Sequence, residues 1–325
     1  MSEELLHFKC EPEHVGSRLD AFLTHAVTGH SRSRLQKMID AGDVLVNEME
    51  AKPSQKLKFG DEIEVELSEV EAEGFEPEEI PLEIVFEDEH LAVVNKPAGL
   101  VVHPGAGIKS GTLANALAYH FGLSKVTVEH DERGNVDLDK LKARVGIVHR
   151  IDKLTSGLLV VAKSENALEN LSNQFRERSV YKRYVALVHG EIFEDTGTID
   201  AAIAREKHNR TRMGIRAHGR SALSIWRVRE HFEKFTLLDV EIKTGRTHQI
   251  RVHLAHINHP IVGDELYNAG RDKTVANIAV RQAIAALGRF FLHAEKLSFD
   301  HPVTGNRLNF KAPLPDELTS FLEVL

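Results

Sequence analysis

The densest group of polar side chains in an apolar setting lies between residues 146 and 163. It includes His149, Arg150, Asp152 and Ser156, and it stands between two aliphatic runs that predict buried strands. We interpret this segment as a loop that presents one carboxylate, Asp152, over a rigid sheet. Turns rich in Asp, Thr and Ser also occur between strands for structural reasons alone. Ser156 is not part of a G-x-S-x-G motif, so the sequence gives little support to a serine hydrolase.

A second group of candidate residues is basic. Between Arg205 and Arg229 the chain holds eight Arg or Lys and a single acid, Glu206. Several of these cations are interleaved with glycines: Lys207, Arg210, Arg212, Arg216 and Arg220. Basic side chains on a pliable segment are typical of a loop that grips RNA phosphates. A merely solvated loop has the same composition, so both interpretations stay open.

Two other patterns are weaker. Residues 105–111 are rich in glycine, but their spacing fits neither G-x-G-x-x-G nor a Walker motif, so we predict no nucleotide site. Four histidines raise the alternative of a zinc site: His248, His253, His256 and His259. The chain has no H-E-x-x-H motif and a single cysteine, so we predict neither a metal nor any other cofactor.

The net charge of −8 conceals an uneven distribution of acidic residues. Residues 61–90 contain fourteen Asp or Glu and no Lys or Arg. The rest of the chain then holds 41 basic against 35 acidic residues, a net charge of +6. Charges act within a Debye length of about 8 Å at physiological salt, so the sign of the whole chain does not exclude a nucleic-acid partner.

The elements that must position these residues fall into two parts, since 325 residues suffice for about two domains. The acidic stretch contains Gly74 and Pro77 and few large apolar residues, which is typical of a linker. We place this linker at residues 71–80. A small domain over residues 1–70 would precede it, and a larger domain over residues 81–325 would follow.

The small domain combines two helices with a short sheet. The first helix begins at Arg18, and the second spans residues 31–40, with Gly42 at a typical C-terminal position. The second helix would bury one stripe, formed by Leu35, Met38 and Ile39. Three cations fall largely off this stripe and form a basic face: Arg32, Arg34 and Lys37. Strands are predicted over residues 43–47 and 62–67.

The larger domain mixes strands and helices without regular alternation. We predict strands over residues 91–95, 157–162, 184–188 and 235–242. Helices are predicted over residues 112–120, after Ser164, and over residues 247–256. This order favours an α+β fold over a doubly wound sheet.

The chain carries no pattern for a membrane or for export. Its apolar runs fall far short of the roughly 18–20 residues of a membrane span, and its first residues lack the regions of a signal peptide. The lone cysteine, Cys10, excludes an internal disulfide framework. We therefore expect a cytoplasmic protein.

The polar loop is one of several ordered motifs. The run His149-Arg-Ile-Asp-x-x-Thr-Ser-Gly157 resembles the signature of the RluA/RluD-type RNA pseudouridine synthases. Further blocks agree in order: residues 95–104, 181–188, 243–253 and 291–294. Residues 16–20 and 43–47 resemble the S4 RNA-binding domain. The resemblance covers most of the chain and implies a catalytic domain with a mixed, largely antiparallel sheet, preceded by a small S4-like domain of helices and strands.

The resemblance also assigns roles to individual residues. Asp152 would be the catalytic aspartate, and Tyr184 the tyrosine stacked on the target base. Arg246 would be the basic partner of the aspartate, and Leu292 would form part of the apolar wall. Arg150 would help to open the RNA. The residues expected to contact RNA are Arg32, Arg34, Lys37, Arg150, Arg210, Arg212 and Arg251.

The implied chemistry requires one carboxylate and no redox step, metal or nucleotide. Uridine becomes its C-glycoside when the N1–C1′ bond breaks and C5 joins C1′, and Asp152 would act as nucleophile or as base at the sugar. A cation beside Asp152 would favour its charged form. The base must leave the helical stack, and Tyr184 offers a stacking face, although a core aromatic would show the same strand spacing.

We therefore predict an RNA pseudouridine synthase, a monomer whose partner is large-subunit ribosomal RNA. The same chemistry on transfer RNA is one alternative, and a non-catalytic RNA-binding or ribosome-assembly factor is another. The chain departs from the family pattern at four places: Ile151, Asn47-Glu48, Lys125–Lys142 and Tyr267-Asn-Ala-Gly. These differences bear on the choice of substrate more than on the chemistry.

Overall fold

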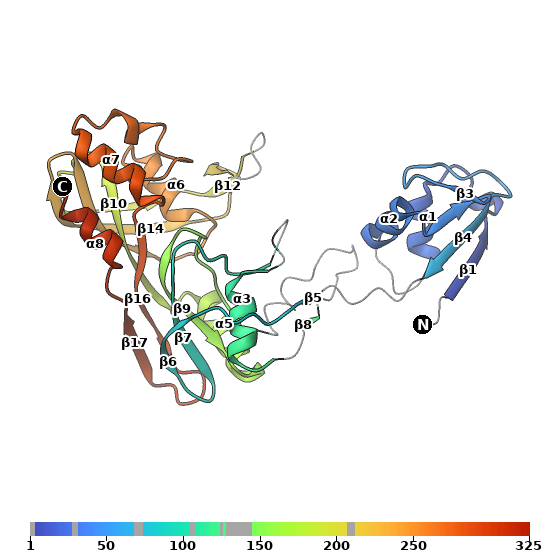
Figure 1. Cartoon of the computed structure of the whole chain (residues 1–325), viewed down its shortest axis with the longest axis horizontal. Helices are drawn as coiled ribbons and strands as arrows, with labels where there is room; N and C mark the ends of the chain where they lie inside the picture. The colour runs from blue at the N-terminus through green and yellow to red at the C-terminus, as the bar shows by residue number, and fades with distance from the viewer. Residues whose placement is uncertain are drawn as a thin grey trace. The chain divides into compact units, whose positions relative to one another are not determined.

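The chain divides into two compact units, formed by residues 1–76 with 124–144 and by residues 77–123 with 145–325 (Figure 1). The computed structural model describes residues 4–27, 32–67, 74–104, 108, 110–123, 126–127, 145–206 and 212–325. The first boundary falls inside the predicted linker, residues 71–80. The segment Lys125–Lys142 lies almost wholly outside the described residues, which include only its strand β8 (Val126–Thr127), paired with β5 (Gly74–Phe75).

The first unit is a four-stranded antiparallel sheet with two helices. Its sheet order is β1-β4-β2-β3. The elements are β1 (Glu4–Lys9), η1 (Pro12–His14), α1 (Leu19–Ala26), α2 (Arg32–Ala41), β2 (Val44–Val46), β3 (Met49–Glu50) and β4 (Glu62–Leu67). The predicted stripe of α2 is buried, because Leu35, Met38 and Ile39 pack into a core with residues of α1 and the sheet.

The β2–β3 hairpin turns at the two residues that depart from the usual Asn-Gly pair. Asn47 and Glu48 both have positive φ angles, 53° and 63°, the backbone that a two-residue hairpin requires. The Asn47 side chain holds the turn, since its Oδ1 accepts from the N–H of Glu62 and its Nδ2 donates to Asp61, both at 2.9 Å. The missing glycine therefore does not prevent the turn.

The second unit is built on one nine-stranded sheet. The strand order is β11-β14-β15-β10-β16-β9-β7-β6, and β17 also pairs with β16. The strands are β6 (Glu83–Glu87), β7 (Leu91–Lys96), β9 (Ser156–Ala162), β10 (Tyr181–His189), β11 (Thr196–Asp200), β14 (Leu223–Phe232), β15 (Phe235–Ile242), β16 (Leu292–Asp300) and β17 (Arg307–Lys311). Only β9 and β16 run parallel among the pairs described. The predicted α+β fold with a mixed, largely antiparallel sheet is confirmed.

Helices and a small hairpin complete this unit. The helices are α3 (Leu113–His120), α5 (Glu165–Glu177), α6 (Gln249–His256), η2 (Arg271–Thr274), α7 (Ile278–Leu287) and α8 (Asp316–Leu322), and the hairpin is β12 (Ile203–Arg205) with β13 (Met213–Ile215). No helix of the described residues is long and apolar enough to cross a membrane.

Strand β9 connects the predicted site to the core. All seven of its residues are buried. Helix α5 covers one face of β9, where Ala167 and Leu171 pack with Leu158 and Val160. Ser164 caps this helix by accepting from the N–H of Ala167 at 3.3 Å. The loop before β9 is thus joined to a strand that is buried along its whole length.

We expect Gly157→Ala to destabilise the second unit by about 3 kcal/mol or more. Gly157 has φ +114°, and a Cβ there would lie 2.3 Å from the carbonyl oxygen of Ala294 in the parallel neighbour β16. Urea unfolding measures the change. Gly305→Ala is the control, because it has positive φ but open space, and we expect a loss of only about 1–2 kcal/mol. Equal losses would contradict the argument from close approach.

Candidate active site

The loop that carries Asp152 is held at its start by a half-buried histidine, His149. Nε2 of His149 accepts from the N–H of Val160 at 3.0 Å, and the ring stacks on Phe175 with 4.5 Å between centroids. Burial, aided by the nearby Lys182 ammonium, lowers the pKa of His149 to about 3. The ring is therefore neutral at physiological pH and acts as a structural acceptor.

Lys96, the last residue of β7, fixes the middle of the loop. Its side chain is fully buried. Its Nζ donates to the carbonyl oxygens of Pro97, Leu100 and Lys153 at 2.8, 2.9 and 3.1 Å. These three acceptors match the three N–H donors of an ammonium. The residue after Asp152 is thereby tied through its carbonyl to the turn that follows β7.

Ser156 fixes the end of the loop. Nε2–H of His293 donates to the carbonyl of Ala312 at 3.3 Å, so Nδ1 of the same ring accepts from the Ser156 hydroxyl at 2.9 Å. Nη2 of Arg289 donates to that hydroxyl at 3.0 Å. Ser156, His293 and Arg289 are all buried. The hydroxyl therefore supports the loop and is not available as a nucleophile.

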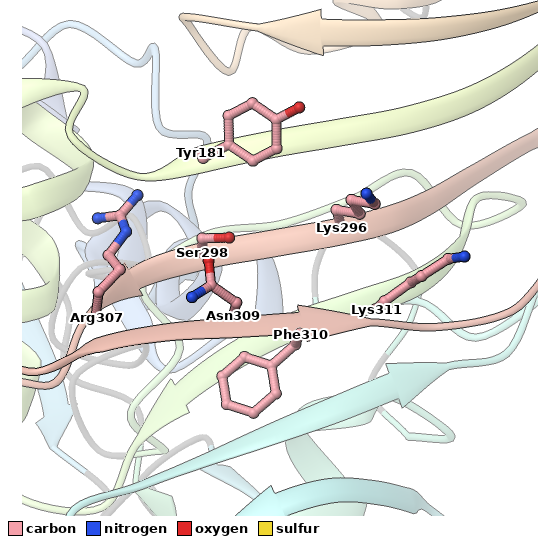
Figure 2. Close-up of a pocket in the computed structure, with 7 residues that line it drawn as sticks. All are labelled: Tyr181, Lys296, Ser298, Arg307, Asn309, Phe310 and Lys311. Atoms are coloured by element: carbon pink, nitrogen blue, oxygen red, sulfur yellow. The ribbon is translucent and has the colours of Figure 1, made fainter. Parts of the chain in front are cut away.

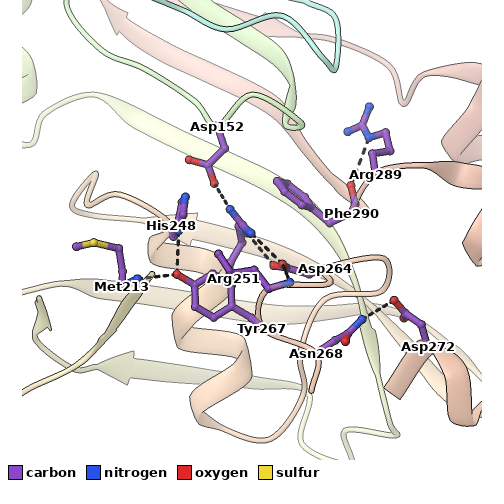
Figure 3. A network of polar contacts seen from close by, with 11 residues as sticks. Asp152, Met213, His248, Arg251, Asp264, Tyr267, Asn268, Asp272, Arg289 and Phe290 are labelled. Carbon is purple, nitrogen blue, oxygen red and sulfur yellow. Dashed lines mark hydrogen bonds and ion pairs between the residues drawn. The ribbon is translucent and has the colours of Figure 1, made fainter. Parts of the chain in front are cut away.

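Asp152 itself meets a buried arginine of α6 (Figure 3). Nη1 of Arg251 donates to Oδ2 of Asp152 at 3.1 Å. The other nitrogens of Arg251 form a two-bond pair with Asp264, Nε to Oδ2 at 2.7 Å and Nη2 to Oδ1 at 2.8 Å. The Asp264 side chain is 1% exposed, that of Arg251 8%, and that of Asp152 21%. One carboxylate is thus buried behind the arginine, and the other is open to a ligand.

Two aromatic rings enclose the Arg251 guanidinium. Its central carbon lies 4.3 Å from the ring centroid of Phe290 and 4.9 Å from that of Tyr267. Burial works against the charge of Arg251, but hydrogen bonds to Asp264 and the carboxylates of Asp264 and Asp152 outweigh it and raise its pKa. Arg251 is therefore a fixed cation at the floor of the site.

His248 closes one side of this group. It precedes α6 with φ 56°, and its Nδ1 lies 2.8 Å from Oη of Tyr267. The same hydroxyl accepts from the N–H of Met213 at 2.9 Å. Burial lowers the pKa of His248, while the nearby Asp152 carboxylate works in the opposite direction. The hairpin β12–β13 is thus linked to the arginine site through one phenol.

Comparison with known proteins identifies the family of this chain. Residues 90–256 match the model of the RNA pseudouridylate synthase family, and residues 17–63 match the S4 domain. The chain belongs to the RNA pseudouridylate synthase family.

Relatives match over nearly the whole chain. It is 40% identical to the ribosomal large subunit pseudouridine synthase D of Haemophilus influenzae over 329 residues, which cover all of this chain and 96% of the relative. It is 42% identical to an uncharacterised RNA pseudouridine synthase of Aquifex aeolicus, covering 98% and 96% of the two chains. Among solved structures, the human RNA pseudouridylate synthase domain containing 1 has a TM-score of 0.54 and 27% identity, covering 74% of this chain and 87% of that chain.

The basic partner of Asp152 in this family member is Arg251, and the prediction that named Arg246 is wrong. Arg246 lies in the loop before α6, where its Nε donates to the carbonyl of Ser221 and its backbone N–H donates to Gln249. Arg251, predicted as an RNA contact, is buried with its nitrogens directed at Asp152 and Asp264. It is therefore not free to meet a phosphate.

Tyr184 and Leu292 lie on neighbouring strands. Tyr184 in β10 is buried, and burial together with the Asp152 carboxylate raises its pKa, so its phenol is neutral beside the site. Leu292 in β16 is also buried and pairs with Ala186 of β10. The roles expected for both residues stay predictions.

The predicted RNA-binding residues have different surroundings. Arg150 is exposed, and its charge acts on His248 beside the site. Arg212 lies 5.3 Å over the ring of Tyr267. Arg32 in the S4 domain donates to the buried Asp20 at 3.0 Å. Arg210 and the side chains of Arg34 and Lys37 lie outside the described residues.

Three of the four histidines considered for zinc have other partners. His253 uses both ring nitrogens, Nδ1 towards Ser224 and Nε2 towards the carbonyl of Ala201. His259 contacts the carbonyl of His189 through Nδ1, and His248 contacts Tyr267. No group of three His, Cys, Asp or Glu among the described residues is arranged to hold a metal ion. The absence of a cofactor stays a prediction.

Sequence reasoning missed three parts of this site: Asp264, Phe290 and Lys96. Asp264 precedes Tyr267 by three residues, and Phe290 directly precedes the 291–294 block, so neither stands inside a quoted motif. Lys96 stands in the 95–104 block, but its burial was the informative property, and lysine is seldom fully buried. The sequence does offer one indication of this burial, because Lys96 stands between two apolar runs, residues 91–94 and 97–102.

We expect Arg251→Met to lower the free energy of unfolding by about 3–5 kcal/mol, because it leaves the Asp264 carboxylate buried and unpaired. The double variant Arg251→Met/Asp264→Leu should recover most of this loss. Urea unfolding of the single and double variants gives the coupling. Arg246→Met is the matched control and should cost less than about 1 kcal/mol. Additive effects at positions 251 and 264 would exclude the pair as a stabilising unit.

We expect His149 to make stability fall in acid. Its folded pKa of about 3 lies below the unfolded value of about 6.5, so the unfolded chain binds the extra proton between these values. Stability from this group is complete above pH 6.5 and is lost as the pH falls towards 3. In His149→Gln, the loss between pH 7 and pH 5 should be smaller by about 2 kcal/mol. Identical losses in the two proteins would show that His149 titrates normally.

Proposed function

We propose that this protein converts uridine to pseudouridine in large-subunit ribosomal RNA, with Asp152 as the catalytic carboxylate. The observation that carries the proposal is that the two carboxylates bound to Arg251 differ in their exposure to solvent. Asp264 is buried and fixes the arginine, whereas Asp152 is open to a ligand at the other end of the same guanidinium. Membership of the RNA pseudouridylate synthase family supplies the reaction class.

The choice of ribosomal RNA rests on the relatives. Those of Haemophilus influenzae and Vibrio parahaemolyticus are named ribosomal large subunit pseudouridine synthase D and match this chain over 96% or more of its length. The S4 domain supplies a second RNA-binding unit. A substrate of this kind implies work in the cytoplasm. We further propose that the protein acts as a monomer.

The chemistry that we propose uses the described geometry. The carboxylate of Asp152 acts at the sugar of an extruded uridine, as nucleophile or as base, while the N1–C1′ bond breaks. The base turns and C5 bonds to C1′. C5 then loses its proton and N1 gains one, so uridine and product have the same composition. Arg251 holds the carboxylate in place, and Tyr184 and Leu292 form the apolar side on which the base rests.

We expect Asp152→Asn to abolish isomerisation while RNA affinity changes little, because the amide keeps the shape of the carboxylate but cannot attack or accept the proton. Release of tritium from RNA labelled at uridine C5 measures the reaction. Asp195→Asn, at an exposed carboxylate, is the control and should keep full activity. Tritium release by Asp152→Asn above background would move the catalytic role elsewhere. Release from transfer RNA but not from ribosomal RNA would contradict the proposed substrate.

We expect Arg251→Lys to reduce the single-turnover rate on the order of 100-fold, since lysine loses the planar fork and a carboxylate displaced by about 1 Å costs that much. Arg246→Lys, the matched control in the same segment, should stay near the wild-type rate. RNA affinity should change little in both. A larger effect at Arg246 would overturn the assignment of Arg251 as the positioning residue.

A further inference from the structure

A basic hollow of about 450 Å³ lies on strands β10, β16 and β17 of the catalytic unit (Figure 2). Its lining consists of Tyr181, Lys296, Ser298, Arg307, Asn309, Phe310 and Lys311. No residue of the Asp152 site contributes to it. Of the lining residues only Tyr181 stands in a predicted motif, the block of residues 181–188, and the function proposed above gives none of them a role.

The strand register places like charges side by side. Lys296 of β16 stands directly opposite Arg183 of β10 on one side and Lys311 of β17 on the other. Residues directly opposite share a face of the sheet, and like charges in such a row repel. In the next row, Ser298 lies between Tyr181 and Asn309. A row of three cations thus adjoins a row of neutral hydrogen-bonding groups.

The carboxylates around this surface already have cationic partners. Glu295 and Asp239 each pair with both Arg183 and Arg229. Arg307, which lines the hollow, pairs with Asp300 at 3.1 Å, and Glu241 of the neighbouring strand β15 pairs with Lys243. Within the described ranges, no carboxylate lies within 4.0 Å of the ammonium of Lys296 or of Lys311. The charge of the two lysines is therefore left for an external anion.

The hollow and the catalytic site lie on opposite faces of the sheet. Successive residues of a strand point to alternate faces, so Tyr181 and Arg183 share one face and Tyr184 points to the other. Tyr184 lies within the field of the Asp152 carboxylate. A ligand in the hollow therefore cannot be the base that meets Asp152.

We propose that this hollow binds a backbone phosphate of the substrate RNA at a point remote from the modified uridine. Two ammonium groups, a hydroxyl and an amide can together surround the oxygens of a phosphodiester. The Tyr181 ring adds a face on which a base can stack, the combination typical of proteins that follow a single strand. This proposal rests on the proposed function only in that the RNA is taken to be the substrate.

The test is the salt dependence of RNA binding by the full-length double variant Lys296→Gln/Lys311→Gln. Two RNAs are compared, a large-subunit ribosomal RNA transcript and a single uridine-containing hairpin too short to reach around the sheet. For the transcript, the slope of log affinity against log salt should become shallower by roughly 1–2 units, about 0.7–0.9 per lost phosphate contact. For the hairpin, the slope and the single-turnover rate should equal those of the wild type.

The matched control is Lys163→Gln/Lys234→Gln, which removes two lysines that have glutamate partners, Glu87 and Glu191. Its transcript slope should equal the wild-type slope. Equal slopes for both double variants would overturn the proposal. The proposal would also be overturned if Lys296→Gln/Lys311→Gln weakened binding of the hairpin as much as binding of the transcript, since that result indicates damage to the catalytic unit.

A second arm separates RNA from a free anion. Inorganic phosphate is titrated at constant ionic strength while the side-chain amide of Asn309 is followed by NMR. Phosphate binding that is lost in the double variant without any change in the transcript slope would identify a small-anion site and overturn the RNA contact. An inactive wild type would contradict the proposed function, yet the binding slopes would still test the hollow.

Discussion

The buried pair between Arg251 and Asp264 determines the geometry around Asp152. Removing two charges from water is costly, and the cost is offset only where the hydrogen bonds are complete. Asp264 provides two of these bonds, and the rings of Phe290 and Tyr267 cover both sides of the guanidinium. Because Nε and Nη2 of the planar guanidinium are bound to Asp264, the position of Nη1 is set, and it donates to Asp152. Helix α6, the turn after it and the residues before β16 must therefore pack together before the site exists.

Hydrogen bonds of buried or half-buried polar groups likewise hold the Asp152 loop at both ends and in the middle. His149 accepts a backbone N–H of β9, Lys96 satisfies the carbonyl of Lys153, and Ser156 completes a network with His293 and Arg289. Leaving a buried polar group without a partner costs more free energy than its hydrogen bond contributes. Loop conformations that break these contacts are therefore disfavoured. The carboxylate is held ready for its ligand by groups that never touch that ligand.

Local patterns predicted some of the elements because local physics forms them, but they did not predict β14, β16, β17, α7 or α8. Ser164 and Thr112 cap the helices expected there, and Phe235–Ile242 is a strand with the predicted bounds. The choice between Arg246 and Arg251 could not be made in this way. The two lie five residues apart on either side of a helix start, and the deciding partner, Asp264, comes from another segment. Both arginines stand inside the block of residues 243–253, and the burial that distinguishes them is a property of the tertiary fold.

The net charge of the sequence also fails to predict which charged surfaces the folded protein has. A net charge of −8 describes the sum, whereas a polyanion responds to cations within about one Debye length that have no partner. In the catalytic unit, Glu295 and Asp239 are occupied by Arg183 and Arg229, so these acids cancel arginines and leave the lysines beside them uncompensated. A chain with a net negative charge can therefore have basic surfaces that bind RNA. The ion pairs within the fold determine which charged side chains remain at the surface without an opposite charge beside them.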